Sequence, residues 1–343
     1  MFEKAEYIFE DSPNPHWVRM KKIAADHPEV KGLFGNTPST AVYTALLVFF
    51  QVGIGLLLRD RPVWLILLLS YIIGAVANHA LFVIIHECTH HLVFKNPVAN
   101  KLLSIFANFP QFFPSAISFS KYHMLHHSNQ SEFDYDPDIA GPGEARWIGN
   151  SAFRKTLFLA FFGLIQGFVR PARLKKVKFF EGWFVFNFLI QMAFLFTFLY
   201  FFGYKPLLYF FLSTFFGLGL HPLGGRWIQE HYVTYQNQET YSYYGPLNKL
   251  CFNMGYHNEH HDFMKVPWSR LPRLRSLAPE HYDALHSYSS WTRLIFRFII
   301  DPEITLFRRI VRPSRGAMAA SGAKTEKECR QENFEPGTQP VLS

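Results

Sequence analysis

The chain has little cysteine and little charge, and each shortage excludes a class of protein. Among 343 residues there are three cysteines, Cys88, Cys251 and Cys329, which are odd in number and scattered, so no disulfide framework is expected. Charged residues make up 17% of the chain and hydrophobic residues 49%, which excludes a disordered protein. The net charge of +8 suits an anionic membrane surface better than nucleic acid.

Several familiar signals are also missing. Residues 1–39 are polar and contain prolines, so no cleavable signal peptide is expected, and Phe2 excludes N-myristoylation. No Gly-x-Gly-x-x-Gly motif opens a strand–helix unit, and His221-Pro-Leu-Gly-Gly225 differs from the haem-binding His-Pro-Gly-Gly by an extra leucine. The chain therefore offers no electron carrier of its own.

Long apolar runs are what the chain has instead. The candidate membrane spans are Thr40–Leu58, Pro62–Ile85, Trp183–Phe202 and Pro206–Leu220, since a span needs roughly 20 mostly apolar residues. A further run, Leu157–Val169, is too short and leads into basic residues, which favours an interfacial helix with snorkelling flanks over a buried core helix. We predict an all-α integral membrane protein with about four transmembrane helices.

The basic residues predict an orientation and a division of the chain. The only basic residues in the predicted outer loops are Arg59, Arg61 and Lys205. Because basic residues gather on the cytoplasmic side, all three histidine clusters described below are expected on that side. We expect a cytoplasmic segment over 1–39, a membrane domain over 40–310 and a disordered polar tail over 311–343. The endoplasmic reticulum in a eukaryote and the inner membrane in a bacterium are equally compatible with this pattern.

Three histidine clusters carry the main functional signal. They are His86-Glu-Cys-Thr-His90-His91, His123-Met-Leu-His126-His127 and His257-Asn-Glu-His260-His261. Residues at i, i+3 and i+4 share one helical face, so each cluster directs several imidazoles to one point. So many imidazoles indicate a pair of transition-metal ions, such as iron, zinc, copper or nickel. The expected ligands are His86, His90, His123, His126, His127, His257, His260 and His261.

Three more histidines are possible members of this site. His231 lies between the last span and the third cluster, and it is favoured over His221, which follows that span directly. His91 lies about 100° round the helix from His90, so it is either a ligand or a neighbour. We keep His91 and His221 as alternative ligands.

The acidic residues within the clusters allow two interpretations. His86-Glu87-Cys88-Thr89-His90 matches the His-Glu-x-x-His signature of zinc hydrolases, in which the glutamate is the general base. That alternative leaves most of the histidines unexplained. We therefore expect Glu87 and Glu259 to hold the ligands in their neutral tautomers through hydrogen bonds. A metal transporter is a non-enzymatic alternative, but its spans would need more polar residues than these contain.

Two other features are expected to lie outside the site. The acidic stretch Asp134-Tyr-Asp136-Pro-Asp138 lacks EF-hand spacing and is interpreted as a solvated turn. His16 stands apart from the clusters and is interpreted as a surface residue.

Longer motifs resemble a known family. Phe119–His127 (FSKYHMLHH), Glu239–Asn248 (ETYSYYGPLN) and Gly255–Phe263 (GYHNEHHDF) are similar to the sphingolipid Δ4-desaturases, within the membrane fatty-acid desaturase/hydroxylase superfamily. Gly217-Leu-Gly-Leu-His221-Pro222 and Glu230-His231-Tyr232 extend this resemblance.

The resemblance implies an architecture and an activity. It implies a cytoplasmic helical cap that holds a histidine-rich di-iron site, and O2 as co-substrate. It also implies a membrane lipid substrate, dihydroceramide or another acyl lipid, and a separate electron donor such as cytochrome b5 or ferredoxin. The implied product contains a trans C4–C5 double bond. A sphingolipid C4-hydroxylase stays open as an alternative, because hydroxyl rebound at C4 would compete with the second hydrogen abstraction. An acyl-lipid desaturase also stays open, because His91 makes the first cluster similar to the His-x-x-x-His-His box of acyl-lipid desaturases.

Overall fold

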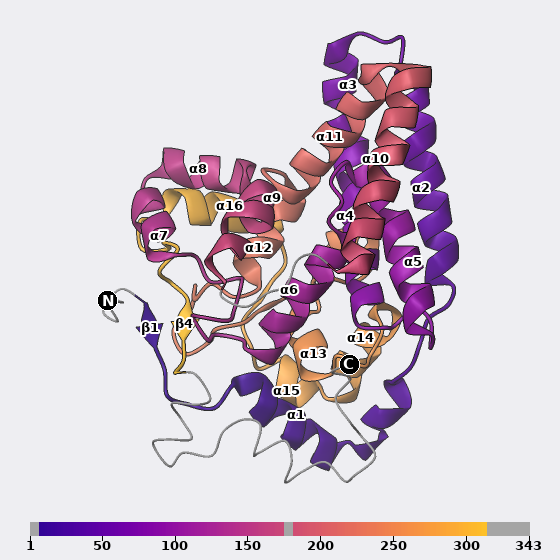
Figure 1. Ribbon diagram of the computed structural model, residues 1–343. Helices are drawn as coiled ribbons and strands as arrows, with labels where there is room; N and C mark the ends of the chain where they lie inside the picture. The colour runs from indigo at the N-terminus through magenta and orange to yellow at the C-terminus, as the bar shows by residue number, and fades with distance from the viewer. Residues whose placement is uncertain (1–6, 175–180, 314–343) are drawn as a thin grey trace.

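Helices dominate the computed structural model, which describes residues 7–174 and 181–313. A column of long helices stands on a wider body of short helices and loops (Figure 1). The column helices are α2 Thr40–Leu57, α3 Val63–Leu69, α4 Ala75–Thr89, α10 Gly182–Phe202 and α11 Tyr204–Leu218. The other helices are α1 Pro15–Asp26, α5 Pro97–Asn108, α6 Ala116–Ser128, α7 Pro142–Ile148, α8 Ala152–Ala160, α9 Phe162–Leu164, α12 Arg226–Gln229, α13 His257–Asp262, α14 Leu271–Leu277, α15 Pro279–Tyr282 and α16 Trp291–Ile300.

The column confirms the four predicted spans. In the described part of the chain, four helical stretches are long and apolar enough to cross a membrane: Thr40–Leu57, Val63–Thr89, Gly182–Phe202 and Tyr204–Gln229. The second contains a π-helical turn, Ser70–Gly74, that joins α3 to α4, and it is longer than predicted because α4 continues to Thr89. The fourth extends beyond α11 through short helical turns. These two extensions carry histidines from the column towards the body.

Polar side chains inside the column satisfy one another, as burial in an apolar environment requires. The Gln51 amide donates to Asn78 Oδ1 over 2.5 Å, and the Asn78 amide donates to Thr214 Oγ1 over 2.9 Å. His79 Nδ1 lies 2.9 Å from the carbonyl oxygen of Gly217, so this buried imidazole bonds to the neighbouring helix α11. At Gly217 a Cβ would lie 2.7 Å from the Ala75 carbonyl oxygen, so glycine permits this close approach of α11 to α4.

A sharply bent helix pair, α5 and α6, packs beside the column and was not predicted as a unit. The two helices meet at 115°, either as a broken span or as a re-entrant loop. Pro110 lies at the break, and the Asn108 side chain holds the corner, because its Oδ1 accepts from the Ala116 amide at 2.8 Å. Polar residues such as Asn100 and Ser104 interrupt the apolar run of α5, so its sequence does not resemble a membrane span.

The run predicted as an interfacial helix, Leu157–Val169, is a bent pair instead. Helix α8 and the following turn from Phe162 to Arg173 meet at 64°. Phe158 is buried, and its ring centroid lies 6.1 Å from that of Phe298 in α16. Arg170 is also buried, in an ion pair with Glu144, so this basic residue does not snorkel. The basic residues that follow this run, Lys175, Lys176 and Lys178, lie outside the described residues.

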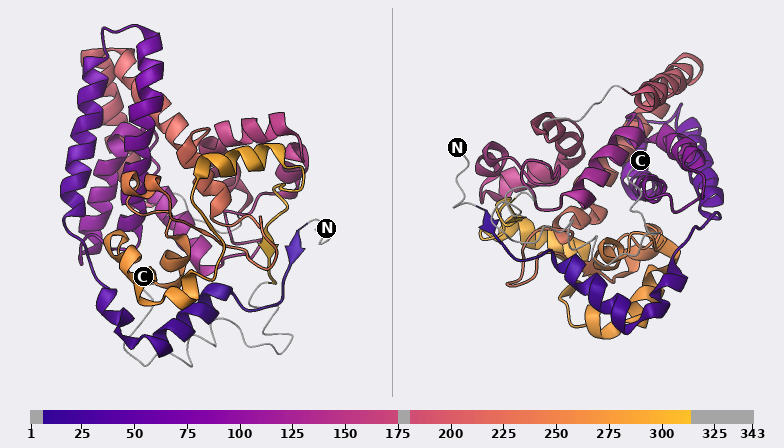
Figure 2. Two further views of the ribbon diagram at one scale, coloured as in Figure 1. Left: turned by 180° about the vertical axis from the view of Figure 1, so that it is seen from behind. Right: turned by 60° about the horizontal axis from the view of Figure 1, so that its bottom comes forward.

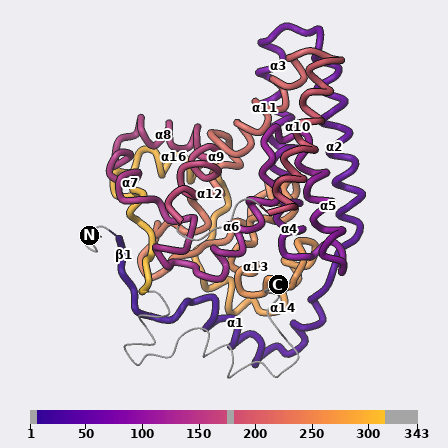
Figure 3. The backbone as a smooth tube through the Cα atoms, viewed as in Figure 1, coloured from indigo at the N-terminus to yellow at the C-terminus, as the bar shows by residue number. Residues whose placement is uncertain are grey.

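Short parallel strand pairs tie distant segments together. Strand β1 (Ile8–Phe9) pairs with β4 (Ile310–Val311), and β2 (Ser242–Tyr243) pairs with β3 (Ser287–Tyr288). Figure 3 shows the first pair as the indigo and yellow ends of the chain lying side by side. Ordered structure thus continues past residue 310, and residues 314–343 of the predicted tail lie outside the described residues.

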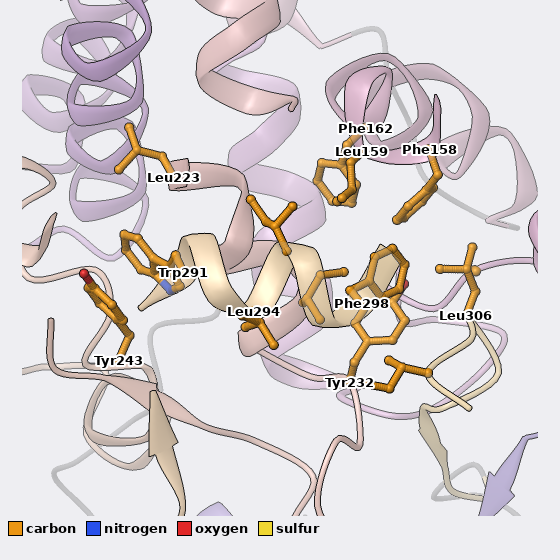
Figure 4. Packing of buried hydrophobic residues seen from close by; sticks show 14 of the residues in the cluster. Phe158, Leu159, Phe162, Leu223, Tyr232, Tyr243, Trp291, Leu294, Phe298 and Leu306 are labelled. Atoms are coloured by element: carbon orange, nitrogen blue, oxygen red, sulfur yellow. The ribbon is translucent and has the colours of Figure 1, made fainter. Parts of the chain in front are cut away.

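A hydrophobic core organises the body around α16 (Figure 4). Trp291 stacks on Tyr243 with 3.9 Å between ring centroids, and its indole N–H donates to Gln229 Oε1 over 2.7 Å. Leu294 and Phe298, which also belong to α16, are buried in the same core. This core fixes the end of α12 at Gln229, two residues before His231.

Helix α1 crosses the end of the body that lies away from the column, next to α13 and α15 (Figures 1 and 2). Its apolar residue Ile23 packs in a second core with Val30, Phe263 and Leu274. The N-terminal segment is therefore fixed against the residues that follow the third histidine cluster.

Candidate metal centre

Three helix ends present the histidines. His86 lies in the last turns of α4, and His90 is its C-cap. The next residue, His91, has a φ of 56°, so the chain turns away there. Helix α6 carries the second cluster and the six-residue helix α13 carries the third. The i, i+3 and i+4 spacing therefore does place several imidazoles on one side of α6 and of α13.

The first histidine group draws on all three clusters. It consists of five residues whose ligand atoms lie within 4.8 Å of one another: His86, His90, His123, His127 and His260. The Nε2 atoms of His90 and His127 each lie 2.9 Å from Nε2 of His123. Nε2 of His260 lies 3.4 Å from Nε2 of His127. Ring nitrogens that face one another at such distances suit a shared cation.

The second histidine group lies directly beside the first. It consists of His126, His231 and His261, whose ligand atoms also lie within 4.8 Å of one another. His257 adjoins this group, with its Nε2 3.2 Å from Nε2 of His231. The two groups touch where the rings of His127 and His261 stack at 4.2 Å. The arrangement therefore provides two adjacent cation sites.

The donors fit metal ions better than they fit one another. Buried ring nitrogens without a hydrogen-bond partner occur in both groups, including both nitrogens of His86, Nδ1 of His260, and Nε2 of His126 and His261. A buried polar atom without a partner costs free energy, and metal coordination would remove that cost. The residue types also fit, because neutral imidazole is a common ligand of iron and zinc.

Burial keeps most of these imidazoles neutral. It lowers the pKa of His90 to about 3. It also lowers the pKa of the ligand candidates that follow α12 in the chain, which are His231, His257, His260 and His261. Metal binding requires the deprotonated ring, so the folded chain presents these donors in the required state.

Asp136 corrects the interpretation of the acidic stretch as a solvated turn. Its carboxylate is buried, and its Oδ1 lies 2.9 Å from His126 Nδ1, while Asp138 lies 3.4 Å from the same nitrogen. Burial opposes the charged form of His126, yet these two carboxylates raise its pKa to about 9. Such a carboxylate orients the imidazole and leaves Nε2 for a metal. Sequence spacing alone gave no sign of this contact, although the residues are ten positions apart.

The two predicted glutamates have different surroundings. Glu87 accepts a hydrogen bond from the Trp268 amide at 3.0 Å, and its other oxygen lies 3.6 Å from His86 Nδ1. Glu259 accepts hydrogen bonds from Ser242 Oγ and Tyr244 Oη, both at 2.6 Å. Glu259 therefore joins α13 to the ETYSYYGPLN stretch. Burial raises its pKa to about 7.

Glu230 is an acidic neighbour that the sequence analysis did not identify as such. It pairs with Arg226 one helical turn earlier, and its carboxylate lies 3.9 Å from His257 Nδ1.

The remaining candidate histidines lie outside both histidine groups. His221 Nδ1 accepts from the Leu223 amide at 3.3 Å, so His221 caps a turn and lies outside both groups. His91 also lies outside both groups, and its carbonyl accepts from the Asn36 side chain. His16 is buried rather than exposed, which corrects the interpretation as a surface residue.

Comparisons with known proteins identify the family of the chain. The model of the family described as "Fatty acid desaturase" matches residues 62–292, and that of "Sphingolipid Delta4-desaturase (DES)" matches residues 3–39. The chain is 42% identical over 310 residues to a rice protein named "Sphingolipid delta(4)-desaturase DES1-like", covering 90% of this chain and 93% of the relative. It is 37% identical over 320 residues to human "Sphingolipid delta(4)-desaturase DES1", covering 92% and 97%. It is 38% identical over 319 residues to a Caenorhabditis elegans "Putative sphingolipid delta(4)-desaturase/C4-monooxygenase", covering 92% and 87%.

Proposed function

Because the chain belongs to the fatty acid desaturase family and within it to the sphingolipid Δ4-desaturases, we propose that it introduces a trans C4–C5 double bond into dihydroceramide. The observation that carries this proposal is the convergence of all three histidine clusters on two adjacent buried groups. An unactivated methylene C–H bond needs a strong oxidant, and a pair of redox-active ions is a suitable source of one.

The two ions of the proposal are iron. The first would be held by His86, His90, His123, His127 and His260, and the second by His126, His231, His257 and His261. Bound iron would supply the reductive activation of O2. In the balanced reaction, two hydrogens leave C4 and C5, two electrons and two protons are added, and O2 becomes two waters.

The residues of the chain position the lipid and exclude water. Phe119 stacks on His123 with 5.1 Å between centroids, and Phe82 lies 4.6 Å from Phe119. These rings form an apolar wall beside the first histidine group. Such a wall would hold a methylene chain near the ions and keep water from the oxidant.

The proposal also includes an electron donor and an orientation. With no carrier motif in the chain, electrons come from a separate protein such as cytochrome b5 or ferredoxin. The few basic residues at the far tip of the column, including Arg59 and Lys205, support a cytoplasmic metal centre in the endoplasmic reticulum of a eukaryote or the inner membrane of a bacterium. A fused reporter that is modified only in the lumen would test this topology, because modification of an N-terminal fusion would contradict it.

The experiment that tests the function is lipid mass spectrometry. A host without Δ4-desaturase, expressing this chain and fed sphinganine, should accumulate Δ4-unsaturated ceramide, and the same host with His260→Ala should not. Unchanged lipid with well-expressed wild-type protein would overturn the proposal.

A C4-hydroxylase is the second candidate, favoured by the double name of the C. elegans relative. The same spectra distinguish it, because a 4-hydroxy product is heavier by one oxygen than dihydroceramide. A zinc hydrolase has less support, since such sites have three protein ligands and an open position, whereas the first group alone contains five imidazoles.

A further inference from the structure

The N-terminal segment makes direct contact with the metal centre. Helix α1 lies in residues 3–39, the part that matches the sphingolipid Δ4-desaturase model, whereas both histidine groups lie in the part that matches the general desaturase model, 62–292. The core formed by Ile23 and Phe263 fixes α1 against the chain that follows α13. A segment characteristic of the narrower family thus lies against a centre common to the broader one.

Asp262 is the main point of contact. It directly follows His261, and its side chain is fully buried. His16 Nδ1 lies 2.7 Å from Asp262 Oδ1, and Arg19 reaches both oxygens, with Nε 2.6 Å from Oδ2 and Nη2 2.9 Å from Oδ1. A bidentate arginine holds a carboxylate in one orientation. Because this carboxylate is buried, losing its partners would leave an uncompensated charge.

Two further contacts reach members of the second histidine group. The His16 ring packs on that of His261, with 4.9 Å between centroids and 31° between planes. Asn14 caps α1 by accepting from the His16 amide, and its own amide donates to Gln130 Oε1 over 3.1 Å. The Gln130 amide in turn lies 3.4 Å from His231 Nδ1. Residues 14–19 therefore support His261 from behind and His231 through Gln130.

The first histidine group has no comparable support from α1. Its rings contact one another, Phe119 and rings of the second group, and Glu87 approaches His86 from within α4. Among the described residues, the side-chain contacts of His16 and Arg19 lie with each other, Asp262, His261 and Tyr282. The N-terminal segment thus supports one of the two groups selectively.

We propose that His16 and Arg19 are positioning residues for the second histidine group, so that the N-terminal segment sets the affinity of one metal of the pair. This inference rests on the proposed function for the identity of the metal, iron. Loss of a residue that orients a metal ligand typically weakens metal binding by about 10–100-fold. The weakening should be greatest for the second iron, because four of the five ligands of the first group lie on α4, its C-cap and α6, and only His260 shares α13 with Asp262.

The test measures iron rather than activity. Full-length wild type, His16→Phe and Arg19→Met are purified from membranes, and iron per chain and the rate of its release to a chelator are determined. His16→Phe keeps a ring against His261 but removes the contact to Asp262, and Arg19→Met keeps an unbranched side chain. Each variant should keep about one iron and release the other roughly 10–100-fold faster than wild type does.

A matched control lies at the other end of α1, where this helix contacts α15. Glu280→Gln removes the charge from the contact between His27 Nε2 and Glu280, which links the end of α1 to α15 at 2.5 Å but lies away from both histidine groups. This variant should keep two release rates like those of wild type. Gln130→Leu provides a milder variant if the buried charge of Asp262 prevents folding, and it should weaken the second iron alone.

Three results would contradict the inference. Unchanged iron content and release in His16→Phe, Arg19→Met and Gln130→Leu would show that the segment does not position the group. Equal loss of both irons would indicate general destabilisation, as would the same loss in Glu280→Gln. Wild type without iron or without desaturated product would instead overturn the proposed function, so the two failures are distinguishable.

Discussion

The two histidine groups are built by different means, although they touch. The first group consists of imidazoles from three helix ends, and its neighbours are mostly other imidazoles and the apolar rings of Phe82 and Phe119, with Glu87 as its one nearby carboxyl group among the described contacts. The second group is surrounded by carboxylates: Asp136 at His126, Glu230 near His257, and Asp262 beside His261.

This difference separates two tasks. Negative charge close to the second group compensates an ion there and strengthens its ligands as donors. The mostly uncharged first group, beside aromatic rings, suits the approach of a lipid chain. We infer that the first site is built mainly by the packing of the three histidine-bearing helices, and that contacts to carboxylates and to the N-terminal segment complete the second.

The largest effect is expected for a ligand of the first group. His260→Ala removes an imidazole that lies 3.4 Å from His127 Nε2. Conversion of dihydroceramide should fall by more than about 100-fold, because a ligand contributes more than the residue that orients it. Lipid mass spectrometry measures the conversion, and an expressed variant with wild-type conversion would exclude His260 as a ligand.

A ligand of the second group should remove one metal and leave the other. His231→Ala should therefore reduce iron to about one per chain, with little conversion left. His221→Ala provides the matched control, since His221 caps a turn outside both groups and its loss should leave iron unchanged. The opposite pattern, with iron lost only in His221→Ala, would reverse our assignment.

An intermediate effect is expected for Asp136→Asn. The amide is similar in size but lacks the negative charge that faces His126 Nδ1. The affinity for the second iron should fall by about 10–100-fold, while that for the first should be unchanged. Equilibrium competition with a chelator measures both affinities. Equal weakening of the two would remove the contrast between the groups.

The smallest effect is expected for His91→Asn. His91 lies outside both groups, and asparagine also tolerates the positive φ at this position. Iron content and conversion should stay within about twofold of wild type, because surface-like changes typically alter free energies by no more than about 0.5 kcal/mol. A loss of iron would add His91 to the first group.

Local patterns in the sequence predict the first group better than the second. Spacing within each cluster places His123 and His127 on one helical face, and apolar runs locate all four spans, although the fourth continues nine residues past its predicted end. The partners of the second group come from elsewhere in the chain: His16 and Asp262 are 246 residues apart. Periodicity does not predict such a contact, so His16 was interpreted as a surface residue.

The sequence also does not predict which carboxylates are buried beside the histidines. Asp136 lies in a stretch whose composition is typical of a solvated turn, yet a hydrogen bond from the Ser131 amide and the His126 contact bury it completely. The choice of His231 over His221 depended only on order along the chain, and the structure brings His231 into the second group. Sequence patterns therefore identify donors, whereas the fold determines which partners orient them.

The most direct measurement is a titration of metal-free, full-length protein with ferrous iron in the absence of oxygen. We expect binding that saturates at about two irons per chain. The two irons should bind with distinguishable affinities, since the two groups of convergent imidazoles have different hydrogen-bond partners. Saturation at about one iron per chain, or no binding, would contradict a two-metal centre built from all three histidine clusters.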